Sequence, residues 1–374
     1  MANREQKNEN LDSMENPKNK KKKKHILARK RTRRWIARSV LALLSLSFIF
    51  ISLYWIPANL TYRISESLTI SSADSTEFNL VILLPTTGSY QTVSEPEVDW
   101  AGSWQSERAG RANLVRLEGA IQAGETLTAT ISYDVHLVMG KAIWTGEPVL
   151  SEELLPQEGI PSGSPEVIAQ AEGLMVENEP LTTAGQIYDA VACQTGLTDS
   201  REQANVLAAF NRAAQIPTRV VTGWVLPDSV PLFRRQIGKD TGLQFWNEVF
   251  LQDLWRLEDA SCCRRFPRQR LLGWSDGRHL VLETGGDLEA VYRSLAKEAG
   301  QDGWQLSSSS SPAYVIWSTD GAETPEVVPV MIVKKTWDGR WVMAIAVVVI
   351  LTVLEGMMET DHLTKRQKRK AFVD

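Results

Sequence analysis

Hydrophobic and polar residues alternate with a period of two through most of residues 61–138. Residues 126–137 alternate across six pairs, which is typical of a strand with one buried face. Residues 78–84 are mostly apolar and stop before Pro85, as expected of a more deeply buried strand. Glycines separate these runs at spacings typical of turns. The pattern therefore predicts a small antiparallel β-sandwich over residues 61–147.

The apolar period changes after a linker at residues 148–163. Ser164, which precedes a proline, is typical of a helix start, and apolar residues then recur on one helix face. Farther along, Ser200 with Gln203 three residues later predicts a capping box that opens another helix. Strands are predicted at residues 218–225, 245–251 and 254–258. Helices followed by an antiparallel sheet indicate an α+β domain over residues 164–300.

Two apolar runs lie outside these domains. Residues 39–56 carry no charge, and a helix of that length nearly crosses the hydrocarbon core of a membrane, about 30 Å thick. Residues 341–358 are apolar apart from Glu355, and residues 301–340 before them are expected to form a loop and a strand. We predict two transmembrane helices. A cleaved signal peptide is the alternative for the first run, and a buried core helix is the alternative for the second.

The formal charge of −4 hides an uneven distribution. Residues 1–38 carry fourteen Lys and Arg against four Asp and Glu, and residues 359–374 carry five against three. Basic flanks stay in the cytoplasm, so both tails are predicted to be cytoplasmic and the domains between the runs to lie outside the cell membrane. The predicted partner is therefore a lipid membrane and not nucleic acid, although a basic tail that binds nucleic acid is the alternative.

Three passages in the second domain occur in a recognisable order. An alanine-rich helix leads into Ile-Pro-Thr-Arg-Val-Val-Thr-Gly at 216–223, Phe-Trp-Asn-Glu-Val follows at 245–249, and Trp-Arg-Leu-Glu-Asp follows at 255–259. Together they resemble the transglutaminase-like family. The resemblance implies a papain-like core of helices packed on an antiparallel sheet. The complete expectation is an α+β fold in which this core is preceded by a small β-sandwich and flanked by two transmembrane helices, as in membrane-anchored bacterial members.

The family's catalytic positions carry different residues here. In the family a nucleophilic Cys starts the helix, a His opens the first strand and an Asp closes the second. The resemblance places Ser200 at the Cys position, Gln244 at the His position and Asp259 at the Asp position. A serine hydroxyl needs a general base, and an amide cannot act as one. The sequence therefore predicts that this site is catalytically inactive.

Each of these residues also has a structural interpretation. Ser200 suits the N-cap of its helix, and Asp259 suits a hydrogen bond to the Gln244 amide or to a backbone turn. Trp224 and Trp246 suit the core, although a shallow cleft that they line with Gln244 could bind a peptide or a glycan without reacting.

The favoured hypothesis is an inactive, externally facing module that binds or holds an envelope protein, peptide or glycan. One alternative is an active envelope hydrolase or acyl transferase of the cysteine type, with its nucleophile relocated to Cys262 or Cys263 and His279 as base. Another is a subunit of a membrane complex. The three cysteines show no disulfide or metal-ligand spacing, and no cofactor or metal is expected.

Overall fold

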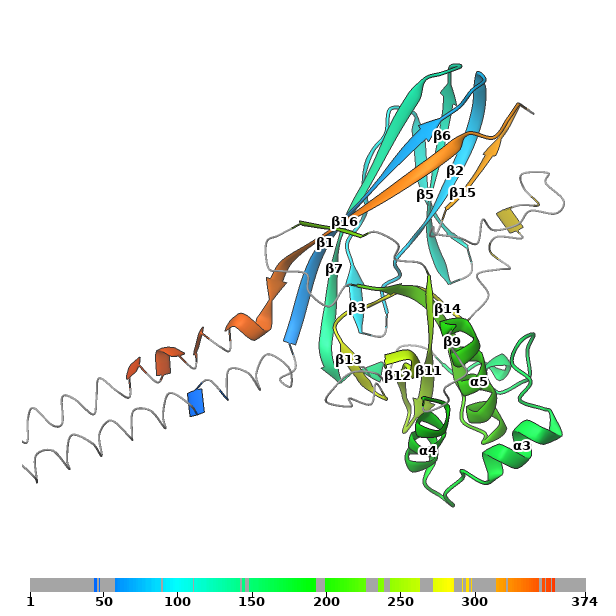
Figure 1. The fold of residues 1–374 in the computed structure, drawn as a ribbon, viewed down its shortest axis with the longest axis vertical. Coiled ribbons are helices and arrows are strands. Elements are labelled where there is room, and N and C mark those ends of the chain that lie inside the picture. Colours follow the sequence, from blue (N-terminus) through cyan, green and yellow to red (C-terminus); the bar gives the residue numbers. More distant parts are fainter. Residues whose placement is uncertain are drawn as a thin grey trace, which may run out of the picture. The chain divides into compact units, whose positions relative to one another are not determined.

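The computed structural model describes most of the chain, and Figure 1 draws its elements. The described residues are 44, 45, 47 and 58–353, except for 89, 110, 142, 145–147, 193–198, 227–234, 239–242, 263–271, 286–290, 292–293, 296, 298–313, 321, 343–344, 347 and 351. The chain forms two compact units. Pro57–Gly339 is one unit, and Met1–Ile56 with Arg340–Asp374 is the other. The candidate site lies in the first unit.

The prediction of two flanking transmembrane helices is wrong. No helix among the described residues is both long and apolar enough to cross a membrane. Of residues 39–56 only three are described, and the described parts of 341–358 are short helical stretches. A sufficiently long apolar run is necessary for a span, but the run does not by itself decide which backbone it adopts.

The described part is also richer in strands than the predicted α+β arrangement. Among the elements with described bounds, sixteen are strands and three are α-helices, and the strands form three sheets. The largest sheet has the order β10-β16-β1-β7-β13, with β3 and β4 also paired to β7. Its strands are β1 (Ala58–Ser71), β3 (Gln91–Val93), β4 (Glu97–Asp99), β7 (Thr126–Lys141), β10 (Arg235–Gly238), β13 (Trp274–Asp276) and β16 (Glu326–Asp338).

A second, four-stranded sheet shares a core with the first. Its order is β15-β2-β6-β5, from β2 (Thr76–Leu84), β5 (Ser103–Ala109), β6 (Ala112–Ile121) and β15 (Tyr314–Ser318). Every second side chain of β1 is buried, as the period-two pattern predicts. Apart from Glu66, these side chains join those of β2, β6 and β7 in one apolar cluster. The strands predicted upstream therefore form, and they bury the predicted face.

Two late strands complete this β region. β16 pairs with β1 along its length, from Leu60 opposite Asp338 to Ser71 opposite Glu326, and β15 pairs with β2. Both strands come from a stretch for which only a loop and a strand were expected. Pairing between such distant segments depends on which surfaces meet in three dimensions, so local pattern could not assign these strands to a sheet.

The third sheet carries the helices. Its order is β14-β9-β11-β12-β8, from β8 (Ile143–Trp144), β9 (Thr218–Val225), β11 (Gln244–Leu251), β12 (Leu254–Glu258) and β14 (His279–Thr284). The remaining elements are α3 (Pro165–Glu172), α4 (Pro180–Ala192), α5 (Ser200–Ala213) and the short 3₁₀ turns η1 (Ser151–Glu153) and η2 (Ala260–Cys262). α5 packs on this antiparallel sheet, and α3 and α4 pack against α5.

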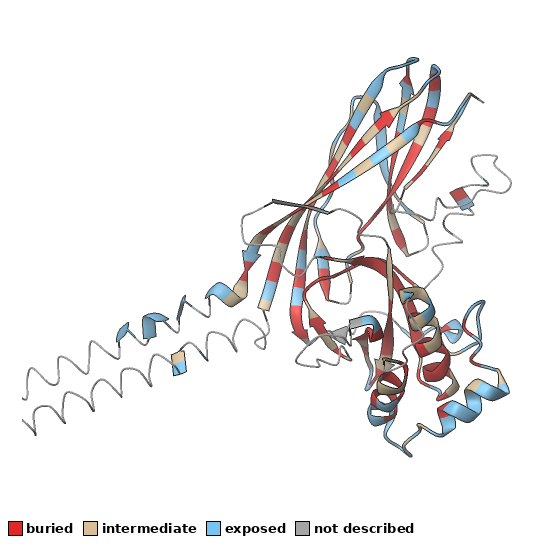
Figure 2. Ribbon diagram, in the orientation of Figure 1, coloured by how far each residue is buried: buried red, intermediate tan, exposed pale blue. Residues whose placement is uncertain are grey.

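Both faces of the third sheet are covered, and β9 is buried along nearly its whole length (Figure 2). On one face, Ala204 and Ala208 of α5 pack against Val220. Val221, the next residue of β9, points to the opposite face and packs there with Trp246. The sheet therefore sorts its side chains into a layer facing α5 and a separate layer behind it.

The helix starts agree with the sequence in one case and differ in another. Ser164 caps α3, because its side chain accepts a hydrogen bond from the Val167 amide. The cap of α5 is Asp199 and not Ser200, since the Asp199 carboxylate accepts from the Arg201 amide. Aspartate and serine are comparable caps, and the negative charge of an aspartate also suits the positive end of the helix dipole.

Candidate functional site

Ser200 is the first residue of α5 and reaches toward the start of β11. Its Oγ accepts a hydrogen bond from the Phe245 amide at 3.3 Å. Phe245 follows Gln244, the half-buried first residue of β11, whose main chain pairs with Gly223 of β9. The structure therefore brings together the start of the helix and the start of the strand, where the family carries its Cys and its His.

This placement predicts that a reactive thiol can be rebuilt. In the double variant Ser200→Cys, Gln244→His, the introduced thiol is expected to have a pKa well below the ordinary value of about 8.5. A thiolate at position 200 is stabilised by the N-terminus of α5 and by an imidazolium on the adjacent strand. The measurement is the pH dependence of alkylation at position 200, in a full chain that lacks the three native cysteines.

The two single variants are the controls for this experiment. Ser200→Cys alone retains the helix N-terminus but has no imidazolium, so its thiol pKa is expected to fall only part of the way. Gln244→His alone provides no thiol and sets the background of alkylation. An ordinary titration in a folded double variant would show that positions 200 and 244 do not face each other.

Asp259 makes its contacts elsewhere. Its carboxylate is 2% exposed, and its Oδ1 accepts from the Ser261 amide at 2.8 Å and from the Ser261 hydroxyl at 2.6 Å. Its Oδ2 lies 2.8 Å from Nε2 of His279. Asp259 thus holds the η2 turn and a buried histidine. That use matches the expected bond to a backbone turn and adds a partner that the sequence did not indicate.

His279 is completely buried between two carboxylates. Its Nε2 faces Asp259, and its Nδ1 lies 3.1 Å from Oδ1 of Asp276. Trp246 meets the ring edge to face, with centroids 5.0 Å apart. A histidine that acts as general base must offer one nitrogen to the reacting proton. Here both nitrogens are occupied, so the imidazole is arranged as a structural link.

Charge stabilises the Asp276 side of this link. Burial raises the pKa of the Asp276 carboxyl, but hydrogen bonds and attraction from His279 and Arg278 outweigh it and hold the pKa well below its usual value. Arg278 Nε lies 2.7 Å from Oδ2 of Asp276. Gly277, between them, has a φ of +74°, and a Cβ there would lie 2.4 Å from a Leu60 methyl. In the sequence, the run Asp-Gly-Arg-His at 276–279 is a turn followed by a histidine, and it is the local pattern that could have indicated this cluster.

Arg219 of the passage 216–223 and Glu248 of the passage 245–249 form a buried ion pair. Arg219 Nη2 lies 2.6 Å and its Nε 2.8 Å from Oε2 of Glu248. Each side chain is 1% exposed, and the guanidinium carbon lies 4.3 Å from the centre of the Trp255 ring. The pair holds β9 against β11 and leaves no charge free for chemistry.

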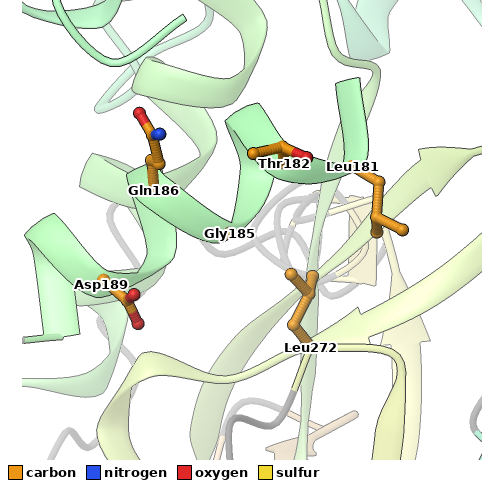
Figure 3. A pocket seen from close by; sticks show the side chains of 6 residues that line it. All are labelled: Leu181, Thr182, Gly185, Gln186, Asp189 and Leu272. Atoms are coloured by element: carbon orange, nitrogen blue, oxygen red, sulfur yellow. The ribbon is translucent and has the colours of Figure 1, made fainter. Parts of the chain in front are cut away.

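A pocket of about 480 Å³ lies beside α4 (Figure 3). It is lined by Leu181, Thr182, Gly185, Gln186, Asp189 and Leu272. None of the residues singled out from the sequence takes part. Among the described residues no group of three or more His, Cys, Asp and Glu side chains is arranged to hold a metal ion.

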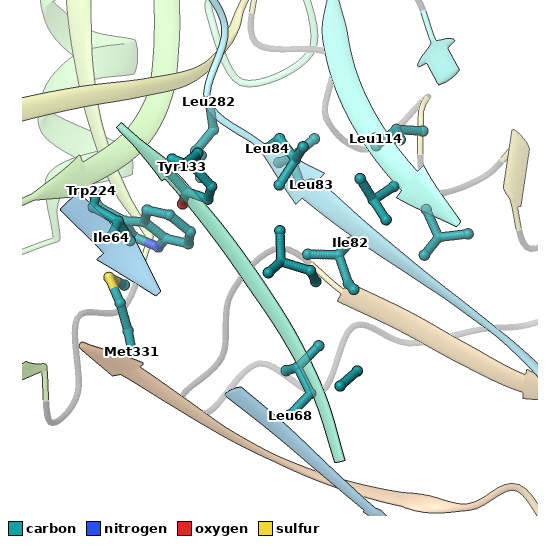
Figure 4. Close-up of a cluster of buried hydrophobic side chains, with 14 of the residues drawn as sticks. Ile64, Leu68, Ile82, Leu83, Leu84, Leu114, Tyr133, Trp224, Leu282 and Met331 are labelled. Atoms are coloured by element: carbon teal, nitrogen blue, oxygen red, sulfur yellow. The ribbon is translucent and has the colours of Figure 1, made fainter. Parts of the chain in front are cut away.

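Trp224 and Trp246 line no cleft, because 0% and 1% of their surfaces are exposed. Trp224 belongs to the core shared with the β strands, where Figure 4 shows its indole near Tyr133 and Met331. Trp246 lies on the other side of the sheet and donates from Nε1 to the Tyr90 hydroxyl at 3.0 Å. Both tryptophans are therefore core side chains.

The cysteine side chains of the relocated site are not among those that the structure describes. Cys262 closes η2, three residues after Asp259, and His279 is already bonded to Asp259 and Asp276. Cys193 and Cys263 lie outside the described residues.

Comparison with known proteins identifies the core. Residues 175–260 match the transglutaminase-like superfamily, so this part of the chain has a transglutaminase-like core and the resemblance is confirmed. A solved structure of a proposed cysteine protease from Cytophaga hutchinsonii is 16% identical, with a TM-score of 0.41, and the match covers 73% of this chain and 97% of that one. A proposed protease from Parabacteroides distasonis is 13% identical, with a TM-score of 0.24, over 62% and 48% of the two chains. A comparison with curated proteins found no match.

Proposed function

We propose that this transglutaminase-like protein does not catalyse acyl transfer and acts instead as a binding or structural module at the cell envelope. Its partner in this proposal is an envelope protein, peptide or glycan. The envelope location rests on the basic ends of the sequence, each of which adjoins a long apolar run. The inactive site rests on the geometry around Ser200 and His279.

The observation that carries the proposal is the use of His279. His279 is the one histidine among the described residues of this domain. Both of its ring nitrogens face carboxylate oxygens. The hydroxyl of Ser200 faces a main-chain amide, and the adjacent Gln244 cannot accept a proton in the useful range. Without a base the hydroxyl stays protonated and is a weak nucleophile. In this proposal the start of α5 and the start of β11 lie together as in the family, but no proton transfer serves them.

A binding role suits the pocket beside α4. Thr182, Gln186 and Asp189 offer a hydroxyl, an amide and a carboxylate there, and Leu181 and Leu272 offer apolar surface. Peptides and glycans present hydrogen-bonding groups next to apolar faces, so such a lining fits either class.

We predict that the full chain shows no amine incorporation and no peptide hydrolysis above background. Since no proton acceptor among the described residues serves position 200, Ser200→Ala is expected to leave this baseline unchanged. Release of ammonia from glutamine peptides and cleavage of casein measure the two reactions. Activity that disappears with Ser200→Ala would refute the proposal. Activity that survives Ser200→Ala but disappears with Cys262→Ala would instead support the relocated nucleophile.

A further inference from the structure

Three polar side chains form a buried layer between α5 and the third sheet. Asn247 of β11 and Glu258 of β12 are paired across the two strands, and Asn211 of α5 faces them. All three are 0% exposed. Asn211 Nδ2 donates to Oε2 of Glu258 at 2.7 Å, and Asn247 Nδ2 donates to the Ala204 main-chain oxygen at 2.9 Å. Each amide therefore uses its N–H group to join the helix to the sheet.

The remaining oxygens of this layer lack donors. Oδ1 of Asn211, Oδ1 of Asn247 and Oε1 of Glu258 are buried, and none has a hydrogen-bond partner within the described residues. A buried acceptor without a donor destabilises the fold, and a charged one destabilises it more. Cross-strand partners have Cβ atoms only about 4.5–5.5 Å apart, so the Glu258 carboxyl lies within reach of the Asn247 amide. A proton on Oε1 would turn one acceptor of the layer into a donor.

The charged groups of the surrounding elements are engaged elsewhere. From α5, the Arg212 guanidinium donates to main-chain oxygens. From β9, Arg219 bonds Glu248 on the opposite side of the sheet. From α4, the Tyr188 hydroxyl donates to the main-chain oxygen of Asp259. Among the described side chains, Asn211 alone donates a hydrogen bond to the Glu258 carboxyl. The Asn211 amide is neutral, so it cannot balance a negative charge on that carboxyl.

We propose that Glu258 is a neutral carboxylic acid in the folded protein and that its O–H donates to Oδ1 of Asn247. This proton joins β12 to β11 and fixes the Asn247 amide, whose Nδ2 in turn holds the Ala204 main-chain oxygen of α5. Loss of the proton would leave a buried carboxylate that the neutral Asn211 amide alone bonds and that repels Oδ1 of Asn247, so the layer that joins α5 to the sheet would loosen. The fold thus contains a pH-sensitive latch between the helix that begins at Ser200 and the strand that leads to Asp259.

The pKa of the Glu258 carboxyl agrees with this geometry. Burial raises the pKa of Glu258 to about 8, against the opposing effect of the Asn211 hydrogen bond. A carboxyl whose pKa is higher in the folded state stabilises the fold most at low pH. The stabilisation is lost as the pH rises from the unfolded pKa, about 4.3, toward the folded one. The latch is therefore closed at neutral pH and opens on the alkaline side.

Glu258→Gln is the test, because its amide keeps one acceptor for Asn211 and one donor for Asn247 but does not titrate. Glu66, buried against the Tyr133 hydroxyl, has a pKa raised to about 7 by burial, so both proteins compared carry Glu66→Gln. The quantity compared is the unfolding constant of the Glu66→Gln protein divided by that of the Glu66→Gln, Glu258→Gln protein. This ratio is expected to rise by up to about tenfold per pH unit between pH 5 and 8. Urea unfolding of the full chain across this range measures the ratio, and parallel profiles would overturn the proposal.

Infrared spectroscopy gives a second readout that does not depend on unfolding. At pH 6 the Glu66→Gln protein is expected to show the carbonyl stretch of a protonated, hydrogen-bonded carboxyl, and Glu258→Gln should remove it. The band should fade as the pH rises past about 8, while amide exchange in residues 204–213, corrected for the intrinsic pH dependence, speeds up. A spectrum unchanged by Glu258→Gln at pH 6 would show an ionised Glu258 and would also overturn the proposal.

Discussion

Replacing Arg219 by methionine is expected to lower the free energy of unfolding by about 3–5 kcal/mol, since it leaves a buried charge without its partner. The guanidinium bonds Glu248 through two nitrogens, and each side chain of the pair is 1% exposed. The substitution also removes the contact of the guanidinium with the Trp255 ring. Urea unfolding of the full chain at neutral pH measures the loss.

Two control variants separate the lone charge from lost packing. In the double variant Arg219→Met, Glu248→Leu no unpaired charge remains, so it is expected to be more stable than Arg219→Met alone. Arg63 pairs with the exposed carboxylate of Glu97, and Arg63→Met is expected to cost less than about 1 kcal/mol. If Arg219→Met cost no more than Arg63→Met, the buried pair would not hold β9 to β11 as described.

Replacing His279 by glutamine is expected to be similarly severe at neutral pH, at about 3–5 kcal/mol. The histidine lies between the carboxylates of Asp259 and Asp276, and without it two negative groups face each other in a buried space. His136, an exposed histidine of β7 whose ring bonds Thr61, is the matched control. His136→Gln is expected to change the stability by less than about 0.5 kcal/mol, as usual for surface positions.

The pH dependence of the His279→Gln effect follows from Asp276. In the native protein the Asp276 pKa is well below its usual value, so its ionised form stabilises the fold above the unfolded pKa of about 3.9. That stabilisation is lost only when the pH falls through the lower folded value. Without His279 the carboxylates are repelled and can relax by taking up protons. The difference between wild type and His279→Gln is therefore expected to shrink from pH 7 to pH 4. A constant difference over this range would contradict the assignment of His279 as the link between the two carboxylates.

The sequence by itself determined the features that depend on neighbouring residues. The period-two alternation marked β1 and β7, and Ser164 before a proline marked the start of α3. The ordered passages at 216–223, 245–249 and 255–259 located the transglutaminase-like core. Backbone preference and the alternation of strand faces act over a few residues, so a pattern in the chain is sufficient to read them.

Only the tertiary structure decided which side chains meet. His279 lies twenty residues beyond Asp259 in the chain, and Arg219 lies twenty-nine residues before Glu248, yet each pair is in direct contact. The return of β16 to β1 belongs to the same class. Such contacts form because sheets and helices must bury their apolar faces together, and the low dielectric of the interior then requires each buried charge to find a partner. Those partners depend on the packed arrangement as a whole, so no local stretch of sequence specifies them.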